Sequence, residues 1–484
     1  MRKILYYYNY IVYYYRSLQI GTRSFRKDLM RTKTKAIDMT TGNILKCMIL
    51  FTIPVVVGNL LQELYSFFDT MIVGRTLGVV KLAAVGITGA LMFFAMGFAI
   101  GNAAGCSVLT SQRFGAGDKK GIERSIAAHY VISLLEAVIL TAVFVSLTGA
   151  LLRALDTGSD MYPHARIYLM IIYAGLPATI LYNMLSSILR AVGDSRTPLI
   201  FLAICSVLNI FLDLLFIIAF GWDVAGAAIA TVASQLISGV ACFFYTKVRF
   251  PELIPSKESF RNIWPEVWDA LKIGIPMGLN MCVTAAGILI VSKVLNSFGS
   301  SAVAAQTICL KMQRLMETVM FAVSTMVSTY VGQNYGAGDF VRIKKGVFQI
   351  SVLSFLYLVF FSALTYIFRH PIIRIFITES NDEMLAFVEQ YLRWMCPFMF
   401  ILGFLHVFRG ANIGLGSGYA ALITGLSELF ARGVFTPLLA PLIGFTSICV
   451  TTPLAWVLCA ALGIILFTAK LKKLRKQGIT PVVD

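Results

Sequence analysis

Charged side chains are scarce in this sequence: Asp, Glu, Lys and Arg make up 13% of its 484 residues, whereas hydrophobic residues make up 58%. A soluble domain carries about twice that share of charge. Only four histidines occur, and none lies in a His-Glu-x-x-His zinc motif. The sequence also lacks a Gly-x-Ser-x-Gly nucleophile motif and the Gly-Lys-Ser/Thr of a phosphate loop. We therefore expect neither an enzyme nor an ATP-driven pump, and no cofactor.

The nine cysteines show no paired spacing, and all lie in or beside apolar segments, as buried structural cysteines do. We expect no disulfide framework and no structural metal. The net charge of +17 is uneven, because residues 1–38 carry nine Lys and Arg against two acids and most other basic residues lie in short loops. This pattern indicates contact with a lipid bilayer and not with nucleic acid.

Apolar segments long enough to cross a bilayer recur twelve times. They cover roughly residues 44–73, 82–111, 126–150, 167–189, 197–219, 224–246, 270–296, 302–331, 347–368, 385–408, 419–441 and 446–469. The sequence therefore predicts an all-α membrane protein with twelve transmembrane helices.

Lys and Arg accumulate on one side of this predicted bundle. Twenty lie after the even-numbered helices and at the C-terminus, against seven in the loops of the other side. Because basic residues favour cytoplasmic loops, we expect a multi-pass protein of the cell membrane with both termini in the cytoplasm.

An internal repeat divides the chain. Gln112-Arg-Phe-Gly-Ala-Gly-Asp118 follows the second helix, and Gln333-Asn-Tyr-Gly-Ala-Gly-Asp339 follows the eighth, 221 residues later. Since each half contains six helices, both enter the membrane in the same sense, which predicts a repeat axis along the membrane normal. The expected parts are a basic, Tyr-rich tail (1–38), an N-terminal lobe (39–246), a cytoplasmic linker (247–269), a C-terminal lobe (270–469) and a basic cytoplasmic tail (470–484).

The first 38 residues allow two interpretations. They have no small-residue cleavage site, so we do not expect a signal peptide. The tyrosine run and the basic stretch after it suit an interfacial anchor. An upstream start codon that adds a dispensable tail before Met39 explains them equally well.

A polar seam lies within the first helix. Asn59, Gln62, Ser66 and Asp69 are three, four and three residues apart, which places them on one stripe of a helix. An ionisable side chain is costly in such a segment unless it faces a protein interior or a wet cavity. We interpret Asp69 as a binding residue for the coupling cation of a transporter.

The fifth and sixth helices carry matching polar pairs. Asn209 and Asp213 are four residues apart, as are Thr231 and Gln235, so each pair shares a helix face. Two carboxylates, a carboxamide and a hydroxyl in a low-dielectric region form either a proton-sharing pair or an oxygen cage for sodium. The expected sodium ligands are Asp69, Asn209, Asp213 and Thr231.

The combination of motifs resembles the multidrug and toxic compound extrusion (MATE) family. It comprises two six-helix halves, Ile53-Pro54 in the first helix, the Gln62, Tyr65 and Asp69 pattern, the repeated Gln-x-aromatic-Gly-Ala-Gly-Asp, and Leu189-Arg-Ala-Val-Gly-Asp-Ser-Arg-Thr-Pro198. The resemblance spans residues 39 to 476. It implies a V-shaped pair of lobes that exports amphipathic, often cationic compounds in exchange for protons or sodium.

The DNA-damage-inducible (DinF-like) branch of that family resembles the chain most. It has acids matching Asp69 and Asp213, an Asn and a Thr matching Asn209 and Thr231, and a first-helix proline matching Pro54. The resemblance implies that Pro54 is a hinge, as a proline inside a helix allows. Some members have an Asn in the fourth helix where this chain has Ser186 and Ser187, so we expect a serine hydroxyl to replace that ligand.

The second half lacks the acid, because Val291 stands where Asp69 would repeat. We therefore expect cation coupling in the N-terminal half. The pairs Arg314/Glu317 and Glu428/Arg432 have helical spacing and are expected to neutralise each other. Glycines 97, 101 and 105 predict close helix packing, and the two Gly-Ala-Gly-Asp segments predict turns and helix caps. The positions of Glu63 and Glu136 stay open.

These features predict a monomeric secondary active multidrug efflux antiporter for amphipathic, cationic compounds. The alternative is a flippase for lipid-linked saccharide precursors, built from the same halves. Such a flippase would line its cavity with Arg and Lys to bind a pyrophosphate, whereas the polar seam here is acidic.

Overall fold

The computed structural model describes residues 36–376 and 382–476, which are almost entirely helical and contain no β-strand. Most of the predicted 1–38 tail and the last residues of the predicted 470–484 tail lie outside the described residues.

The helices of the first half are α2 (Ile44–Leu77), α3 (Val79–Ala116), α4 (Lys119–Ala154), α5 (Tyr162–Ala174), α6 (Leu176–Ala191), α7 (Arg196–Asp213), the π-helix η1 (Leu214–Ala219) and α8 (Asp223–Arg249). Two 3₁₀ turns, η2 (Pro251–Leu253) and η3 (Lys257–Phe260), lie in the predicted linker. The second half contains α9 (Trp264–Asn296), α10 (Ser300–Gly336), α11 (Phe340–Ile367), α12 (Arg369–Phe376), α13 (Asp382–Gly414), α14 (Gly418–Phe430), the π-helix η4 (Ala431–Phe435), α15 (Thr436–Ile443) and α16 (Thr446–Lys476).

Eleven helical segments of the described chain are long and apolar enough to cross a membrane, and the bent pair α5–α6 makes a twelfth span. The predicted count of twelve is therefore confirmed. The fourth span differs in form from a single helix, because α5 and α6 meet at Gly175 with an angle of 46°. Pro177 explains the break: it has no N–H group to donate and lies in the first turn of α6, where proline is tolerated.

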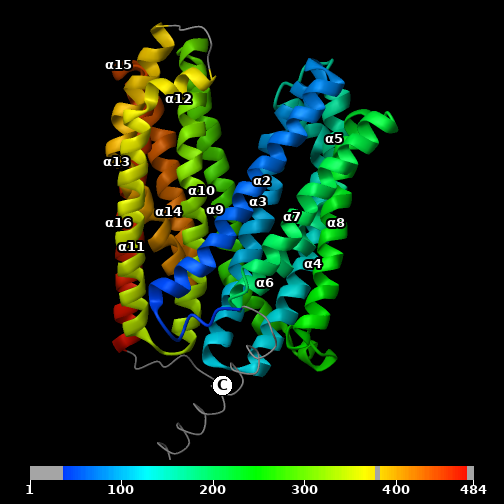
Figure 1. The fold of residues 1–484 in the computed structure, drawn as a ribbon, viewed down its shortest axis with the longest axis vertical. Coiled ribbons are helices and arrows are strands. Elements are labelled where there is room, and N and C mark those ends of the chain that lie inside the picture. The colour runs from blue at the N-terminus through cyan, green and yellow to red at the C-terminus, as the bar shows by residue number, and fades with distance from the viewer. Residues whose placement is uncertain (1–35, 377–381, 477–484) are drawn as a thin grey trace, which may run out of the picture.

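The two halves diverge toward one end of the bundle and produce a V shape (Figure 1). The start of α2 and the end of α16 both lie at the opposite, narrow end, which is called the terminal end below. The V-shaped two-half architecture predicted from the sequence is thus confirmed.

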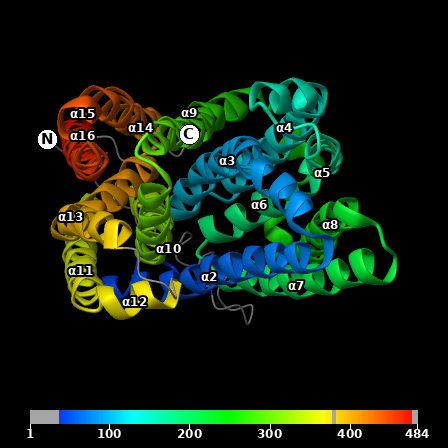
Figure 2. The same ribbon diagram turned by 90° about the horizontal axis from the view of Figure 1, so that it is seen from above.

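Helices α2 and α9 cross between the halves on opposite sides of the bundle (Figure 2). Met48, near the start of α2, is buried among residues of the second half, whereas Ile72, near its end, is buried among residues of α5 and α8. Helix α9 does the reverse, since Val267 is buried against α3 and α4 and Gly287 lies against α14. A relative movement of the halves must therefore involve these two helices, and each has an internal proline, Pro54 or Pro276.

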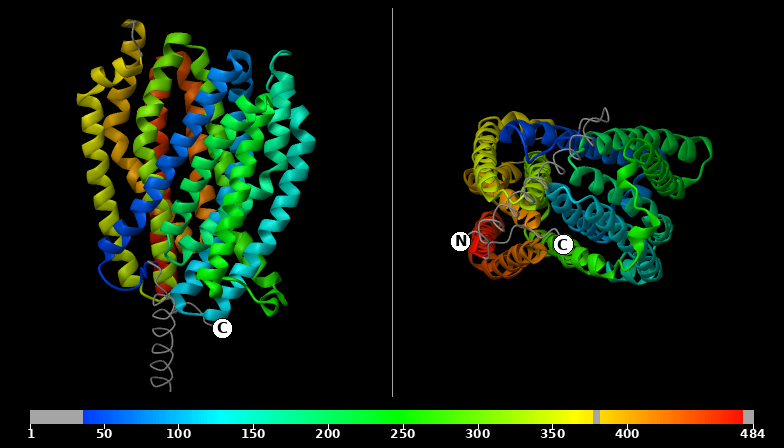
Figure 3. Two further views of the ribbon diagram at one scale, coloured as in Figure 1. Left: turned by 45° about the vertical axis from the view of Figure 1, so that its right-hand side comes forward. Right: turned by 90° about the horizontal axis from the view of Figure 1, so that it is seen from below.

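The repeated motifs meet each other at the terminal end, where α3 and α10 lie side by side (Figure 3). A Cβ atom added to Gly115 would lie 1.8 Å from the carbonyl oxygen of Gln333, and one added to Gly336 would lie 1.8 Å from that of Gln112. Each glycine thus admits the backbone of the other half, as only a residue without a side chain can. No local sequence pattern predicts this reciprocal contact.

The two motif glutamines add hydrogen bonds to it. The Nε2 of Gln112 donates to the carbonyl oxygen of Gly414 at 2.9 Å, and the Nε2 of Gln333 donates to that of Ala191 at 2.9 Å. The Oε1 of Gln333 also accepts a 3.0 Å hydrogen bond from the backbone N–H of Met39. Buried backbone groups from both halves are satisfied in this way at the terminal end.

The same motifs end one helix and begin the next. Gly117 and Gly338 adopt φ angles of 72° and 74°, the left-handed conformation that ends helices. The Asp118 side chain accepts from the backbone N–H of Gly121 at 2.9 Å, and Asp339 accepts from that of Arg342 at 2.8 Å. The predicted turns and N-caps are confirmed.

Glycines of α3 allow close contact with α9. A Cβ added to Gly101 would lie 2.7 Å from the carbonyl oxygen of Met277, and one added to Gly105 would lie 2.6 Å from the Cα of Gly274. This confirms the packing face predicted from the glycine spacing.

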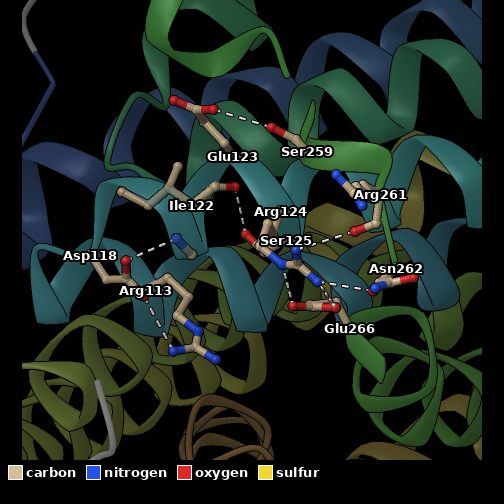
Figure 4. A network of polar contacts seen from close by, with 11 residues as sticks. Arg113, Asp118, Ile122, Glu123, Arg124, Ser125, Ser259, Arg261, Asn262 and Glu266 are labelled. Atoms are coloured by element: carbon tan, nitrogen blue, oxygen red, sulfur yellow. Dashed lines mark hydrogen bonds and ion pairs between the residues drawn. The ribbon is translucent and has the colours of Figure 1, made fainter. Parts of the chain in front are cut away.

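The segment between the halves is fastened to α4 by polar contacts (Figure 4). The Arg124 guanidinium binds both carboxylate oxygens of Glu266, at 2.5 and 2.8 Å, and donates to the Asn262 carbonyl oxygen at 2.9 Å. Ser259 donates to Glu123 at 3.1 Å. These contacts fix the first turn of α9 against the first half.

Candidate functional site

The predicted polar residues of the first half come from three helices. Asp69 lies in the last third of α2, Asn209 and Asp213 lie at the end of α7, and Thr231 lies in α8. Helix α7 continues directly into the π-helix η1 after Asp213. Such wide turns often occur at functional sites, and here the change of helix type coincides with the buried acid.

The structure brings these side chains together. The hydroxyl of Tyr65 donates to Thr231 Oγ1 at 3.4 Å, and Asn209 Nδ2 donates to the same oxygen at 3.5 Å. The carboxyl groups of Asp69 and Asp213 lie close enough to interact electrostatically with each other. Asp213 and Asn209 are fully buried. Tyr65, Asp69, Asn209, Asp213 and Thr231 are together called the acid pair site below.

Several oxygen atoms of the acid pair site have no hydrogen-bond donor nearby. Asp69 Oδ1, both carboxylate oxygens of Asp213 and the Oδ1 of Asn209 are buried and accept no hydrogen bond from a described residue. Two ionised carboxylates cannot hydrogen-bond to each other, because neither has a proton to donate. A proton shared between them would provide the missing donor, and a sodium ion would be coordinated by the same oxygens. These oxygen atoms therefore suit either a proton or a sodium ion.

Three of the predicted supporting residues, all on α2, have no hydrogen bond to the acid pair in the described part of the chain. Asn59 donates to the carbonyl oxygen of Thr318 at 3.3 Å and so connects α2 to α10 of the second half. Gln62 and Ser66 are exposed on the same side of α2. Ser186 is buried in α6, and its role as an oxygen ligand stays a prediction.

Gln235, the partner of Thr231 in the α8 pair, accepts a hydrogen bond from Thr179 Oγ1 of α6. This hydrogen bond connects α6 to α8. Pro54 is buried inside α2, where the helix passes from the second half to the first. Its location suits the hinge that the resemblance implies.

Tyr168 of α5 also belongs to the acid pair site, although no sequence pattern predicted it. Its side chain is buried and lies near Asp69, Tyr65 and Asp213. A tyrosine in an apolar span carries no charge, so no electrostatic cost singled out Tyr168 in the sequence.

A further buried acid of the first half is now placed. Glu136 of α4 accepts a hydrogen bond from Asn102 Nδ2 of α3 at 3.0 Å and is 7% exposed. Glu63 is exposed on α2. Glu136 therefore faces the interior of the first half, whereas Glu63 does not.

The second half contains a buried ionic cluster. Glu428 accepts from Arg432 Nη2 at 3.0 Å and from Arg409 Nη2 at 3.4 Å, so the predicted Glu428/Arg432 pair is confirmed and extended by a third member. The predicted Arg314/Glu317 pair differs. Arg314 is exposed, and Glu317 accepts a 3.0 Å hydrogen bond from Gln313 Nε2 instead.

Twelve apolar spans in two repeated halves, with polar and ionisable side chains held inside each half, define a multi-pass membrane transporter. The comparisons with known proteins agree. The MatE family profile matches residues 54–215 and 276–438. The chain is 33% identical over 411 residues to "Probable multidrug resistance protein YpnP" of Bacillus subtilis, covering 85% of this chain and 92% of that protein.

It is 27% identical over 384 residues to "Probable multidrug resistance protein NorM" of Thermotoga maritima, covering 78% of this chain and 82% of that protein. Its fold matches a crystal structure of a MATE transporter in the bent conformation with a TM-score of 0.84 at 22% identity, covering 92% of this chain and 99% of that one. The chain therefore belongs to the MATE family of transporters.

Proposed function

We propose that this transporter is a secondary active antiporter that exports amphipathic, cationic compounds in exchange for protons or sodium. The observation that carries the proposal is the acid pair site, in which the buried Asp213, the partly buried Asp69 and the amide of Asn209 present buried oxygens that accept no hydrogen bond from a described residue. Buried, unneutralised carboxylates are unstable inside a membrane, so a mobile cation that neutralises them stabilises the site.

The orientation follows from the basic residues, which are concentrated in the loops of the terminal end. We propose that this end faces the cytoplasm of the cell and that the wide end of the V faces outward. In this orientation the contact between the two Gln-x-aromatic-Gly motifs closes the cytoplasmic side, and the structure corresponds to an outward-facing form.

Coupling follows because the cationic substrate and the coupling ion compete for the same two carboxylates. In the outward-facing form the carboxylates of Asp69 and Asp213 attract a cationic substrate until a proton or sodium ion neutralises them. Neutralisation removes the attraction for the substrate and permits α2 to rearrange near Pro54, the buried hinge between the halves. The side chains of Tyr65, Asn209 and Thr231 hold the acid pair in position through their shared hydrogen bonds.

The test is efflux of a fluorescent cationic dye from proteoliposomes that contain the purified protein. A pH gradient and a sodium gradient are imposed separately, with no gradient as the control. We expect dye movement against its concentration gradient with at least one of them. Equal dye movement with and without gradients would exclude antiport.

A further inference from the structure

A cavity lies between the last turns of α4 and the first turns of α5, at the wide end of the first half (Figure 1). Its volume is about 340 Å³, enough for a small molecule or the headgroup of a lipid. Residues between 145 and 153 of α4 and between 162 and 170 of α5 line it. No residue of the acid pair site is among them, so the cavity is a separate candidate binding site.

Two arginines and a tyrosine converge on this cavity. Arg153 lies in the last turn of α4, Arg166 lies in the second turn of α5, and Tyr162 is the first residue of α5. A Cβ atom added to Gly149 would lie 3.7 Å from Arg153 Nη1 and 3.2 Å from the Tyr162 hydroxyl, so both polar groups extend over this glycine. Because Gly149 has no side chain, the space that both groups border stays open.

The positive charge of the two arginines is not neutralised. Neither Arg153 nor Arg166 forms an ion pair with a described residue, whereas Arg369, at the same end of the second half, binds Glu389 at 3.5 Å. None of the lining residues is acidic, and the two aspartates of the 155–161 loop are exposed and do not line the cavity. Two like charges around one cavity attract an anion, and planar guanidinium groups match the oxygens of a phosphate.

The cavity extends from this charged rim into the apolar part of the span. Val145 precedes Arg153 by eight residues, which is about 12 Å along α4. Met170, in the third turn of α5, is also apolar and is 38% exposed. Leu147 and Ile167, close to lining residues in the sequence, are exposed as well, as lipid-facing side chains of a span are. The cavity is therefore charged at the level of the lipid headgroups and apolar at the level of the acyl chains.

We propose that Arg153, Arg166 and Tyr162 bind the phosphate group of an anionic phospholipid from the leaflet at the wide end. The arginines donate to the phosphate oxygens, the Tyr162 hydroxyl donates a further hydrogen bond, and an acyl chain lies along Val145 and Met170. A free phosphate ion would leave the apolar part of the cavity unused. A choline headgroup would bring a positive group toward two arginines, with no acid in the cavity to receive it. Lipid binding at this cavity does not depend on the proposed efflux function.

The test is native mass spectrometry of the purified full-length protein with phosphatidylglycerol or phosphatidylcholine of the same acyl chains. We expect the wild-type protein to bind phosphatidylglycerol more tightly. Arg153→Gln and Arg166→Gln should each weaken phosphatidylglycerol binding about fivefold, the contribution of one basic residue to the binding of anionic lipid, and leave phosphatidylcholine binding unchanged. A double variant with both substitutions should bind the two lipids equally.

Two further variants separate a defined site from a general attraction between charges. Arg75→Gln removes an exposed arginine from the last turn of α2, which does not line the cavity, and we expect an unchanged lipid preference. Gly149→Leu keeps both arginines but fills the space that they border, so we expect it to lose the preference. Thermal unfolding without added lipid shows that each variant is folded. Added phosphatidylglycerol should then raise the unfolding temperature of Arg75→Gln as in the wild type, but not that of Gly149→Leu.

Three results would overturn the proposed lipid site. The first is equal binding of the two lipids by the wild-type protein. The second is a loss in Arg75→Gln as large as that in Arg153→Gln, or an unchanged preference in folded Gly149→Leu, because either would show that the cavity does not select the lipid. The third is displacement of phosphatidylglycerol by an equal concentration of glycerol 3-phosphate, which has the phosphate but no acyl chain.

Discussion

The contact between the two repeated motifs at the terminal end can be opened by adding one carbon atom. In Gly115→Ala the new methyl group would lie 1.8 Å from the Gln333 carbonyl oxygen, and in Gly336→Ala it would lie 1.8 Å from the Gln112 carbonyl oxygen. Contacts of a Cβ atom below 3.0 Å are essentially never observed. The two backbones must therefore move apart by more than about 1 Å, which neither helix can absorb by rotating a side chain.

The clash acts on only one of the two states of an alternating-access cycle. It is present when the terminal ends of α3 and α10 touch, and it is relieved when the halves separate there. Overpacking of this kind costs about 1–3 kcal/mol. A difference of that size between two conformations changes their population ratio about 5- to 150-fold. We expect each variant to raise the population that is open at the terminal end by a factor in this range.

The assay is the distance between spin labels at exposed positions 120 and 344, which lie on α4 and α11 near the contact. The labels are attached to introduced cysteines after the native cysteines have been replaced. Gly86→Ala is the matched control, because a Cβ at Gly86 of α3 meets no atom within 4 Å. If Gly115→Ala and Gly336→Ala gave the same distance distribution as Gly86→Ala, the motif contact would not control the closed state.

Three other substitutions test separate parts of the structure. Gln333→Ala leaves two buried backbone groups without their partner, so we expect a loss of about 1–3 kcal/mol in stability, seen as a lower thermal unfolding temperature; an unchanged temperature would contradict the buried contact. Arg124→Ala breaks the partly exposed pair with Glu266 and should cost less than about 1 kcal/mol, with a smaller effect in high salt. An effect independent of salt would argue against an ionic contribution. Pro54→Ala should keep the fold but slow dye efflux, and wild-type efflux rates would remove Pro54 from the mechanism.

Much of the fold could be predicted because a membrane imposes a simple rule on the sequence. Each span must be apolar over about twenty residues, so twelve spans and their division into two halves are visible without coordinates. The break at Gly175 was less visible, since a proline near the middle of an apolar segment either kinks a helix or begins a new one. Tertiary packing decides between these outcomes.

The acid pair site could be predicted for the same physical reason. Asp69 and Asp213 attract attention because a carboxylate is expensive inside a membrane, and helical spacing then connects Asp213 to Asn209. Tyr168 carries no such cost and was missed. Arg409 was missed as a partner of Glu428 because the two lie on different helices, and local periodicity relates only residues of one helix.

The role of the repeated motifs shows the same limit. The glycine and aspartate residues of the motifs predict a turn and an N-cap from local geometry alone. Their contact joins residues about 220 positions apart, and no local pattern reports that Gly115 must accept the backbone at Gln333. A repeat reveals that two segments are alike, but the structure was needed to show that they touch.

The most direct test of the central claim is gradient-driven efflux of a cationic dye by Asp69→Asn and Asp213→Asn in proteoliposomes. Each substitution keeps the size of the side chain and removes the charge that the coupling cation would neutralise. Glu63→Gln, an exposed acid on the same helix as Asp69, is the control. We predict that both Asp variants lose gradient-driven efflux while Glu63→Gln retains it. Efflux at the wild-type rate in both Asp variants would contradict cation coupling at this site.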